Sequence, residues 1–203
     1  MKMPADLEAA DIALGEKIAR NRKKPAAEAA GKASKIGDQE PLYAISAAVL
    51  LVGGITGDSR LARTGAALIV AVIAADAGKS LVKRSVTRTR PNVLLDEGRY
   101  EVSAGGSGEK PEQSFPSGHM AGSVAFSQAL SREYPIAGAA CGLGSIALGW
   151  GRIAKGAHWP LDIVAGGLIG MAVEWLVNLI FTRPARVLNT QRSLKKLALE
   201  SDV

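Results

Sequence analysis

The chain of 203 residues contains two histidines, and both lie in short polar breaks between apolar runs. His119 follows Pro116-Ser117-Gly118, and His158 precedes Asp162 by four residues. An imidazole ring can transfer protons near neutral pH or act as a nucleophile. Because both rings stand beside helix-starting residues and near arginines, we interpret them as catalytic groups that act on a phosphate ester.

The stretch around His119 predicts an anion site at the start of a helix. Ser117 is a favoured N-cap residue, and an apolar run begins directly after it. The backbone amides of Gly118, His119 and Met120 would then point forward without helical partners, which suits an anion. The alternative for this stretch alone is an ordinary helix cap with a surface histidine.

Two cations upstream could hold the same anion. Lys83 and Arg90 are seven residues apart, about two helical turns, so they share one face if the helix predicted over 61–82 continues. Pro91 then turns the chain away. Two cations on one face can clamp phosphoryl oxygens, arginine with a bidentate fork. A positive flank beside a membrane is the simpler alternative.

The second histidine has a carboxylate at helical spacing. Asp162 can accept the proton of one imidazole nitrogen of His158 and leave the other nitrogen free to attack. Pro160 falls in the first turn of the predicted helix. Arg152, six residues before His158, would be a further phosphate ligand.

Together these residues resemble the signature of the type 2 phosphatidic acid phosphatase superfamily. That pattern reads Lys, six residues, Arg-Pro; then Pro-Ser-Gly-His; then Ser-Arg, five residues, His, three residues, Asp. This chain matches it in order and spacing with Lys83, Arg90-Pro91, Pro116-Ser117-Gly118-His119, Arg152, His158 and Asp162. Gly151 stands where the pattern has serine, so one hydroxyl donor to the phosphate is lost.

The resemblance implies a role for each residue. His158 would be the nucleophile that forms a phosphohistidine, oriented by Asp162, and His119 would protonate the departing alkoxide and then activate water. The phosphate oxygens would be held by Lys83, Arg90, Ser117, Gly118 and Arg152. The scheme needs no metal and no cofactor, and two histidines without a neighbouring Cys, Asp or Glu at ligand spacing make a poor metal site in any case.

Five apolar runs must position these residues, and they predict an all-α, multi-pass transmembrane bundle. A bilayer core of roughly 30 Å needs about 20 apolar residues per helix, and several runs are shorter, so a soluble helical bundle is the alternative. The first run has no polar stripe, which favours the membrane. Asp76 and Glu174 lie inside runs, and we expect both to be partnered or near the interface. The runs span 42–57, 61–82, 120–130, 136–150 and 159–181, giving about five spanning helices.

The remaining segments frame this core. Residues 5–24 predict a weakly amphipathic helix, which lies at the membrane surface or forms a solvated arm. Its charges interrupt the apolar core that a signal peptide needs, so we expect no cleavage. Residues 25–40 have the composition of a linker, and 92–114 that of a long irregular loop, often a lid. We therefore divide the chain into an N-terminal segment 1–40, a membrane-embedded phosphatase domain 41–181 and a basic tail 182–203.

Charge and composition limit the kinds of ligand and partner that the chain could bind. The net charge is +6, and the single cysteine, Cys141, excludes an intramolecular disulfide and a cysteine-based metal cluster. The cations alternate with apolar runs and do not form a stripe with aromatic residues, which argues against nucleic acid. The remaining partners for a basic chain are the bilayer itself and a lipid phosphate substrate.

We therefore expect a lipid phosphatase in a bacterial-type inner membrane. The substrate would be a phosphate monoester or diphosphate such as phosphatidic acid, phosphatidylglycerophosphate or a polyprenyl diphosphate. A lipid phosphotransferase, a vanadate-dependent haloperoxidase-like enzyme and a membrane scaffold or lipid-binding protein are the alternatives. The basic N-terminus favours a cytoplasmic active site, whereas six-crossing bacterial members of the family place theirs on the periplasmic face, so both orientations stay open.

Overall fold

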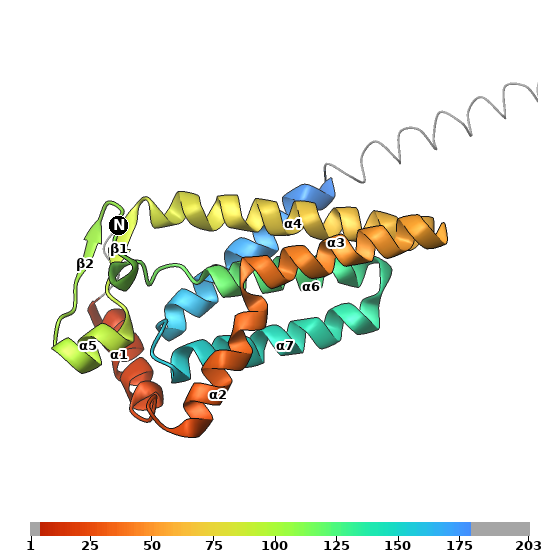
Figure 1. Ribbon diagram of the computed structural model, residues 1–203. Coiled ribbons are helices and arrows are strands. Elements are labelled where there is room, and N and C mark those ends of the chain that lie inside the picture. The colour runs from red at the N-terminus through yellow and green to blue at the C-terminus, as the bar shows by residue number, and fades with distance from the viewer. Residues whose placement is uncertain (1–4, 180–203) are drawn as a thin grey trace, which may run out of the picture.

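The computed structural model describes residues 5–179 as a bundle of long helices with smaller elements gathered at one end (Figure 1). The helices are α1 (Ala5–Ala19), α2 (Pro25–Ala33), α3 (Gln39–Thr56), α4 (Ser59–Lys83), α5 (Pro91–Glu97), α6 (Gly118–Glu133), α7 (Pro135–Ala154) and a further helix, Pro160–Leu179. Two short 3₁₀ helices are η1 (Ser34–Gly37) and η2 (Lys110–Glu112). Strands β1 (Val86–Arg88) and β2 (Val102–Ala104) pair antiparallel, with Val86 opposite Ala104.

Each predicted apolar run forms a helix, which confirms the all-α transmembrane fold class. Within residues 5–179, four helices are long and apolar enough to cross a membrane, namely α3, α4, α7 and Pro160–Leu179. Helix α6 has 16 residues and is shorter than these four. A bundle of about five helices therefore carries the site.

The helix ends follow from local chemistry. Helix α3 stops at Gly57, whose left-handed φ of 72° suits a residue without a Cβ atom. The side chain of Asp58 then accepts hydrogen bonds from the amides of Arg60 and Leu61 and starts α4. Pro135 opens α7, where its missing N–H costs no helical bond. These tight turns make neighbouring helices antiparallel.

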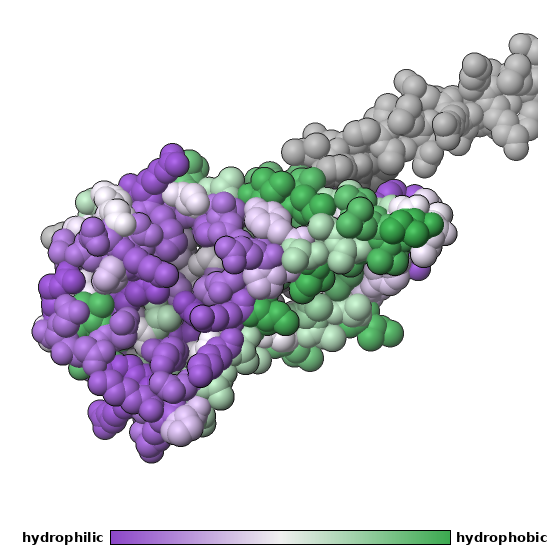
Figure 2. All heavy atoms as spheres, in the orientation of Figure 1, coloured by the Kyte–Doolittle hydropathy of each residue, from purple (hydrophilic) through white to green (hydrophobic). Residues whose placement is uncertain are grey.

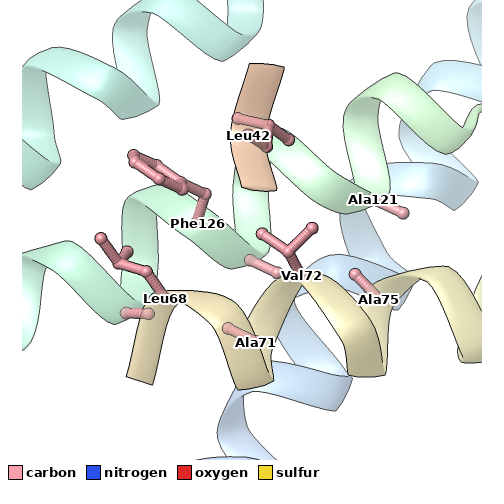
Figure 3. Packing of buried hydrophobic residues seen from close by; sticks show 9 residues of the cluster. Leu42, Leu68, Ala71, Val72, Ala75, Ala121 and Phe126 are labelled. Carbon is pink, nitrogen blue, oxygen red and sulfur yellow. The ribbon is translucent and has the colours of Figure 1, made fainter. Parts of the chain in front are cut away.

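The core lies between α4, α6 and the start of α3 (Figure 3). Leu68 and Val72 of α4 pack against Phe126 of α6, and small residues fill the rest of the contact. A Cβ atom on Gly166 would overlap the backbone of Ser117 at the start of α6, and one on Gly170 would overlap that of Ala121, so the helix Pro160–Leu179 approaches α6 closely. The cluster contains Leu42, Leu68, Ala71, Val72, Ala75, Ala121, Ala125, Phe126 and Ala129.

Large apolar side chains point away from this core. Ile55 and Ile136 are 84% and 87% exposed, and Leu143 and Trp150 are also exposed. Figure 2 shows the apolar residues covering the long helices, while polar residues cover the opposite end. We call that opposite end, formed by α1, α2, α5 and the β1–β2 hairpin, the polar end. An apolar outer surface of this kind suits lipid contact.

The two carboxylates inside the apolar runs, Asp76 and Glu174, are paired, as expected. The Nζ atom of Lys79 lies 2.7 Å from Asp76 one turn earlier on α4. Glu174 is 2% exposed and accepts two hydrogen bonds, of 2.5 and 2.6 Å, from the guanidinium of Arg132 at the end of α6. The bidentate geometry explains how a carboxylate is tolerated at this depth.

Three expectations about the connecting segments change. The predicted linker 25–40 forms α2 and η1, and the predicted irregular loop 92–114 contains most of α5, strand β2 and η2. Helix α4 ends at Lys83, so Lys83 and Arg90 do not share one helix face; strand β1 separates them. The tail 182–203 lies outside the described residues.

Helix α1 forms where predicted, but it packs by an unexpected face. Its buried residues are Asp11, Gly15 and Ala19, whereas Leu7 and Leu14 are about half exposed. The helix therefore docks through small residues and one carboxylate at the polar end, rather than through an apolar stripe.

Candidate active site

All eight predicted site residues lie at the polar end, because the helices that carry them end or begin there. Helices α4 and α7 run toward the polar end, and α6 and Pro160–Leu179 run away from it (Figure 1). The rings of His119 and His158 are 6.4 Å apart between centroids. The amide of Ser117 donates a 3.0 Å hydrogen bond to the carbonyl oxygen of Asp162, which joins two of the motifs directly.

His158 is held in one tautomer by a backbone carbonyl. Its Nδ1 atom lies 2.7 Å from the carbonyl oxygen of Ser114, whereas Oδ2 of Asp162 is 3.7 Å away. A carbonyl can only accept, so Nδ1 carries the proton and Nε2 keeps its lone pair. The predicted hydrogen bond from His158 to Asp162 is therefore replaced by one to Ser114, because the carboxylate is engaged elsewhere.

Burial keeps the ring of His158 neutral. The side chain is 2% exposed, and this burial, reinforced by Arg90 and Arg152, lowers the pKa of His158 to about 4 although Asp162 opposes the shift. A neutral ring with a free Nε2 lone pair is the form that a nucleophile requires.

Asp162 fixes the segments around His158. Its Oδ2 atom accepts hydrogen bonds from the hydroxyl of Ser114 at 2.5 Å and from the amide of Trp159 at 2.8 Å. Its Oδ1 atom accepts one from Nη1 of Arg88 at 2.7 Å. The carboxylate thus positions the Ser114 carbonyl, and through it the histidine.

The Arg88 guanidinium links this carboxylate to the N-terminal helix. Arg88 is 1% exposed, and its Nη2 atom donates to Oδ2 of Asp11 at 2.6 Å. The other oxygen of Asp11 accepts from the amide of Leu161 at 2.9 Å, and Tyr100 accepts from Nε of Arg88 at 3.3 Å. Burial disfavours the charged guanidinium, but Asp162 and the bonds to Tyr100 and Asp11 outweigh it and raise the pKa of Arg88.

Several of these supporting residues were not predicted from the sequence. Arg88 stands between Lys83 and Arg90 in a segment that also contains Arg84, and this additional positive charge was the available signal. Lys79 is a second supporting residue that was not predicted, and its side chain reaches the backbone of Gly118. Its signal was the four-residue spacing to Lys83, which places both lysines on one helix face. Asp11 and Ser114 gave no signal of their own.

The start of α6 combines a free hydroxyl with the second histidine. Ser117 is at the N-cap position, yet its side chain makes no capping hydrogen bond. The carboxylate of Asp38 lies 2.5 Å from Nε2 of His119, although the approach does not have the direction of an N–H hydrogen bond. Burial nevertheless lowers the pKa of His119, and the nearby Arg152 and His158 add to the shift, so the ring is neutral when no anion is bound.

The cations surround these groups. Lys83 donates from Nζ to the carbonyl oxygen of Gln113 at 2.9 Å and lies within electrostatic reach of Arg90 and Asp162. Burial and the neighbouring Arg152 lower the pKa of Arg90. Two buried guanidinium groups that repel each other favour the binding of an anion between them.

The unpaired polar atoms mark the same place. Within residues 5–179, five buried side-chain nitrogen or oxygen atoms lack a hydrogen-bond partner, and four belong to the predicted site. Most buried polar groups in proteins are paired, so a concentration of unpaired ones needs a ligand or a catalytic role. The four are Arg90 Nε, Ser117 Oγ, His119 Nε2 and Arg152 Nε; the fifth is Ser123 Oγ.

Gly151 is explained by the N-terminal segment. A Cβ atom at Gly151 would lie 2.8 Å from the carbonyl oxygen of Ala30 and 3.4 Å from Cβ of Ser34. Helix α2 thus occupies the space that a serine side chain would need. A serine at this position would prevent α2 from docking closely against α7, so the chain lacks that hydroxyl donor.

A cavity of about 560 Å³ opens beside the two arginines. Arg90 and Arg152 line it, together with Asn92, Pro111 and residues of α2. No group of three or more His, Cys, Asp or Glu side chains that could hold a metal occurs in the described part of the chain. The arrangement can bind a tetrahedral oxyanion, present a nucleophilic nitrogen to it and transfer a proton.

Comparison with known proteins gives a consistent result. Residues 64–186, more than half of the chain, match the PAP2 superfamily. Proteins named lipid A 1-phosphatase from Rhizobium johnstonii and Rhizobium etli are 35% and 34% identical over 122 residues, which are 59% of this chain in both cases and 48% and 51% of those proteins. The chain thus spans about half the length of these curated relatives.

Two solved structures share the fold. A PAP2-type phosphatidylglycerolphosphate phosphatase from Bacillus subtilis aligns with a TM-score of 0.63 at 19% identity, covering 89% of this chain and 88% of that one. LpxE from Aquifex aeolicus aligns with a TM-score of 0.55 at 21% identity, covering 81% and 92%. At these identities the likeness concerns the fold.

Proposed function

Because the chain belongs to the PAP2 superfamily, we propose that it is a membrane lipid phosphatase that hydrolyses a lipid phosphate through a phosphohistidine. The single observation that carries the proposal is the set of four unpaired, buried polar atoms on Arg90, Ser117, His119 and Arg152. Three of these groups can donate to phosphate oxygens, and the fourth can deliver a proton.

The first half-reaction follows from the two histidines. Nε2 of His158 attacks phosphorus and forms the P–N bond as the P–O bond to the lipid alcohol breaks. The negative charge of the bound phosphate favours protonation of His119, which then gives its proton to the departing alkoxide. Lys83, Arg90 and Arg152 balance the charge on the equatorial oxygens, and the Gly118 amide adds a donor.

The second half-reaction reverses the proton transfer. His119, now neutral, takes a proton from water, and the resulting hydroxide attacks phosphorus and breaks the P–N bond. His158 leaves as a neutral ring, still held at Nδ1 by the Ser114 carbonyl. The low pKa of His158, about 4, keeps this ring unprotonated in the free enzyme.

The substrate we propose is a lipid whose phosphate reaches the polar end while its tail stays among the long helices. The site residues stand at or near the ends of α4, α6 and α7, and Figure 2 shows polar residues at that end of the molecule and apolar residues along the long helices. The relatives named lipid A 1-phosphatase make the 1-phosphate of lipid A the first candidate, and the Bacillus subtilis structure adds phosphatidylglycerophosphate. We place the catalytic domain at 41–181 and the protein in a bacterial inner membrane.

Phosphate release by the detergent-purified chain tests this proposal. The panel consists of lipid A, phosphatidic acid, phosphatidylglycerophosphate and a polyprenyl diphosphate, each assayed in EDTA. We expect release from at least one lipid and loss of at least a thousandfold in kcat for His158→Ala, because the nucleophile is removed. Release at the wild-type rate by His158→Ala would refute the mechanism, and no release from any lipid would refute the function.

The covalent step has its own test. Denaturing the enzyme in base during turnover of a ³²P-labelled lipid should trap base-stable, acid-labile phosphate on the wild type, but not on His158→Ala. Label that persists in His158→Ala would assign the phosphoenzyme to another residue.

A further inference from the structure

The cavity beside Arg90 and Arg152 is lined by more positive charge than one phosphoryl group requires. Its wall also contains Lys32 of α2, Lys35 of η1 and Lys110 of η2. We call these three the lysine rim. Two segments that are distant in sequence, α2–η1 and η2, thus direct their cations to one opening, which concentrates the field there.

The rim lysines have no acidic partner within the described chain. The one acidic residue of the cavity wall, Glu28, lies 3.3 Å from Nζ of the fourth lysine in the wall, Lys155. In the part of the structure that is described, no carboxylate is within ion-pair distance of Lys32, Lys35 or Lys110. The cavity therefore keeps an excess of positive charge after its own ion pair is counted.

The catalytic cations already account for the reacting phosphate. Lys83, Arg90 and Arg152 supply donors for its equatorial oxygens, so the rim has no remaining task at that group. The volume of about 560 Å³ falls in the range of cavities that hold a whole small molecule. Space and charge together fit a head group with an additional anionic substituent.

We propose that the lysine rim is a second anion subsite, which binds a further phosphate or carboxylate of the same substrate. The preferred substrate class is then a lipid with at least two anionic groups on its head. This inference rests on the proposed function, since it assigns a substrate class to that site. Lys32 and Lys35 lie outside residues 64–186 and Lys110 lies within them, so the N-terminal segment supplies two of the three rim lysines.

Steady-state kinetics on two lipids test the subsite. Phosphatidylglycerophosphate carries a second phosphate, and phosphatidic acid does not. The variant is Lys32→Ala/Lys35→Ala, and the matched control is Lys17→Ala/Lys24→Ala, which removes the same charge from exposed positions that do not line the cavity. We expect the ratio of kcat/KM for phosphatidylglycerophosphate over phosphatidic acid to fall about five- to tenfold in the rim variant, mainly through KM, and to stay within twofold in the control.

A separate arm distinguishes a second group on the substrate from a neighbouring anionic lipid. Phosphatidic acid is assayed in neutral detergent with and without phosphatidylglycerol. If the rim variant loses activity on phosphatidic acid only when phosphatidylglycerol is present, the rim binds a separate lipid and the proposal is overturned. An unchanged substrate ratio in a rim variant that unfolds at the wild-type temperature also overturns it, while leaving the phosphatase assignment intact. Failure of the wild type on these two lipids and also on lipid A and the polyprenyl diphosphate would instead remove the proposed function.

Discussion

Replacing Asp11 by asparagine should destabilise the protein by about 3 kcal/mol, because it breaks a buried ion pair while leaving the volume unchanged. The side chains of Asp11 and Arg88 are each 1% exposed, and their closest atoms are 2.6 Å apart. An asparagine carbonyl can still accept from the amide of Leu161, but its NH₂ group would face a guanidinium N–H. Removal of one partner of a buried pair costs about 3–5 kcal/mol, and we take the lower end because Arg88 keeps Asp162.

Thermal unfolding in detergent, followed by tryptophan fluorescence, measures this cost. Trp159 is fully buried and lies 5.5 Å from the Arg88 guanidinium, so its emission reports on the network directly. The matched control is Asp6→Asn, which removes the same charge from an exposed position of α1. If Asp11→Asn and Asp6→Asn unfold within about 0.5 kcal/mol of each other, the Asp11 carboxylate does not hold the site together.

The same substitution should lower catalysis without changing substrate binding. Asp11 acts through Arg88 on Asp162, and Asp162 fixes the segment that orients His158. Small displacements of a catalytic group can cost about a hundredfold in rate, so we expect kcat to fall about 10- to 100-fold at a temperature where the variant is folded. KM should change less than twofold. An equal loss in kcat and affinity would show that α1 contributes to binding instead.

Further predictions address His158, the neighbouring hydroxyl of Ser114, and Gly151, which contacts α2. Folding lowers the pKa of His158 from 6.5 to about 4, so between these pH values the unfolded chain binds a proton that the folded chain does not. The free energy of unfolding should therefore decrease as the pH falls from 6.5 to 4. Thermal melts at pH 4.5 and 7 should show a smaller decrease for His158→Gln than for the wild type. Ser114→Ala leaves Asp162 with one hydrogen bond fewer and should cost about 1.5–3 kcal/mol in urea unfolding, whereas Ser103→Ala, on an exposed strand, should cost under 0.5. Gly151→Ser should loosen α2 and increase protease cleavage before α3, since its Cβ would lie 2.8 Å from the Ala30 carbonyl; cleavage equal to that of the wild type would refute this packing.

The sequence predicted that the candidate site residues lie together at one end of the bundle, because their positions follow from local signals. Apolar runs show where helices end, and Lys83, Ser117 and Asp162 each stand at or near such an end. Antiparallel helices joined by short turns then bring alternate ends together. Nothing more than run boundaries and residue spacing was needed to place these groups at one end of a bundle.

The supporting residues could not be predicted in this way. Asp11 and Arg88 are 77 residues apart, and the buried face of α1 consists of small residues and a carboxylate, which give no apolar periodicity. Strands β1 and β2 have three residues each, too few for an alternating pattern to be recognised. Helix α2 resembles a linker in composition because it packs through close backbone contact rather than large side chains.

Several of the supporting residues that were not predicted come from the N-terminal segment, and the packing of this segment explains the glycine at position 151. Residues 5–38 precede the part that matches the family, yet they supply Asp11 behind Arg88, Asp38 beside His119, and Lys32 and Lys35 on the rim. A serine at 151 would offer one more donor to the phosphate but would push α2 away from α7, and α2 carries Lys32. The loss of one hydroxyl is thus coupled to the gain of an N-terminal cover. On this reasoning, Gly151→Ser should also reduce the preference for the doubly anionic lipid, in the same direction as the rim variant.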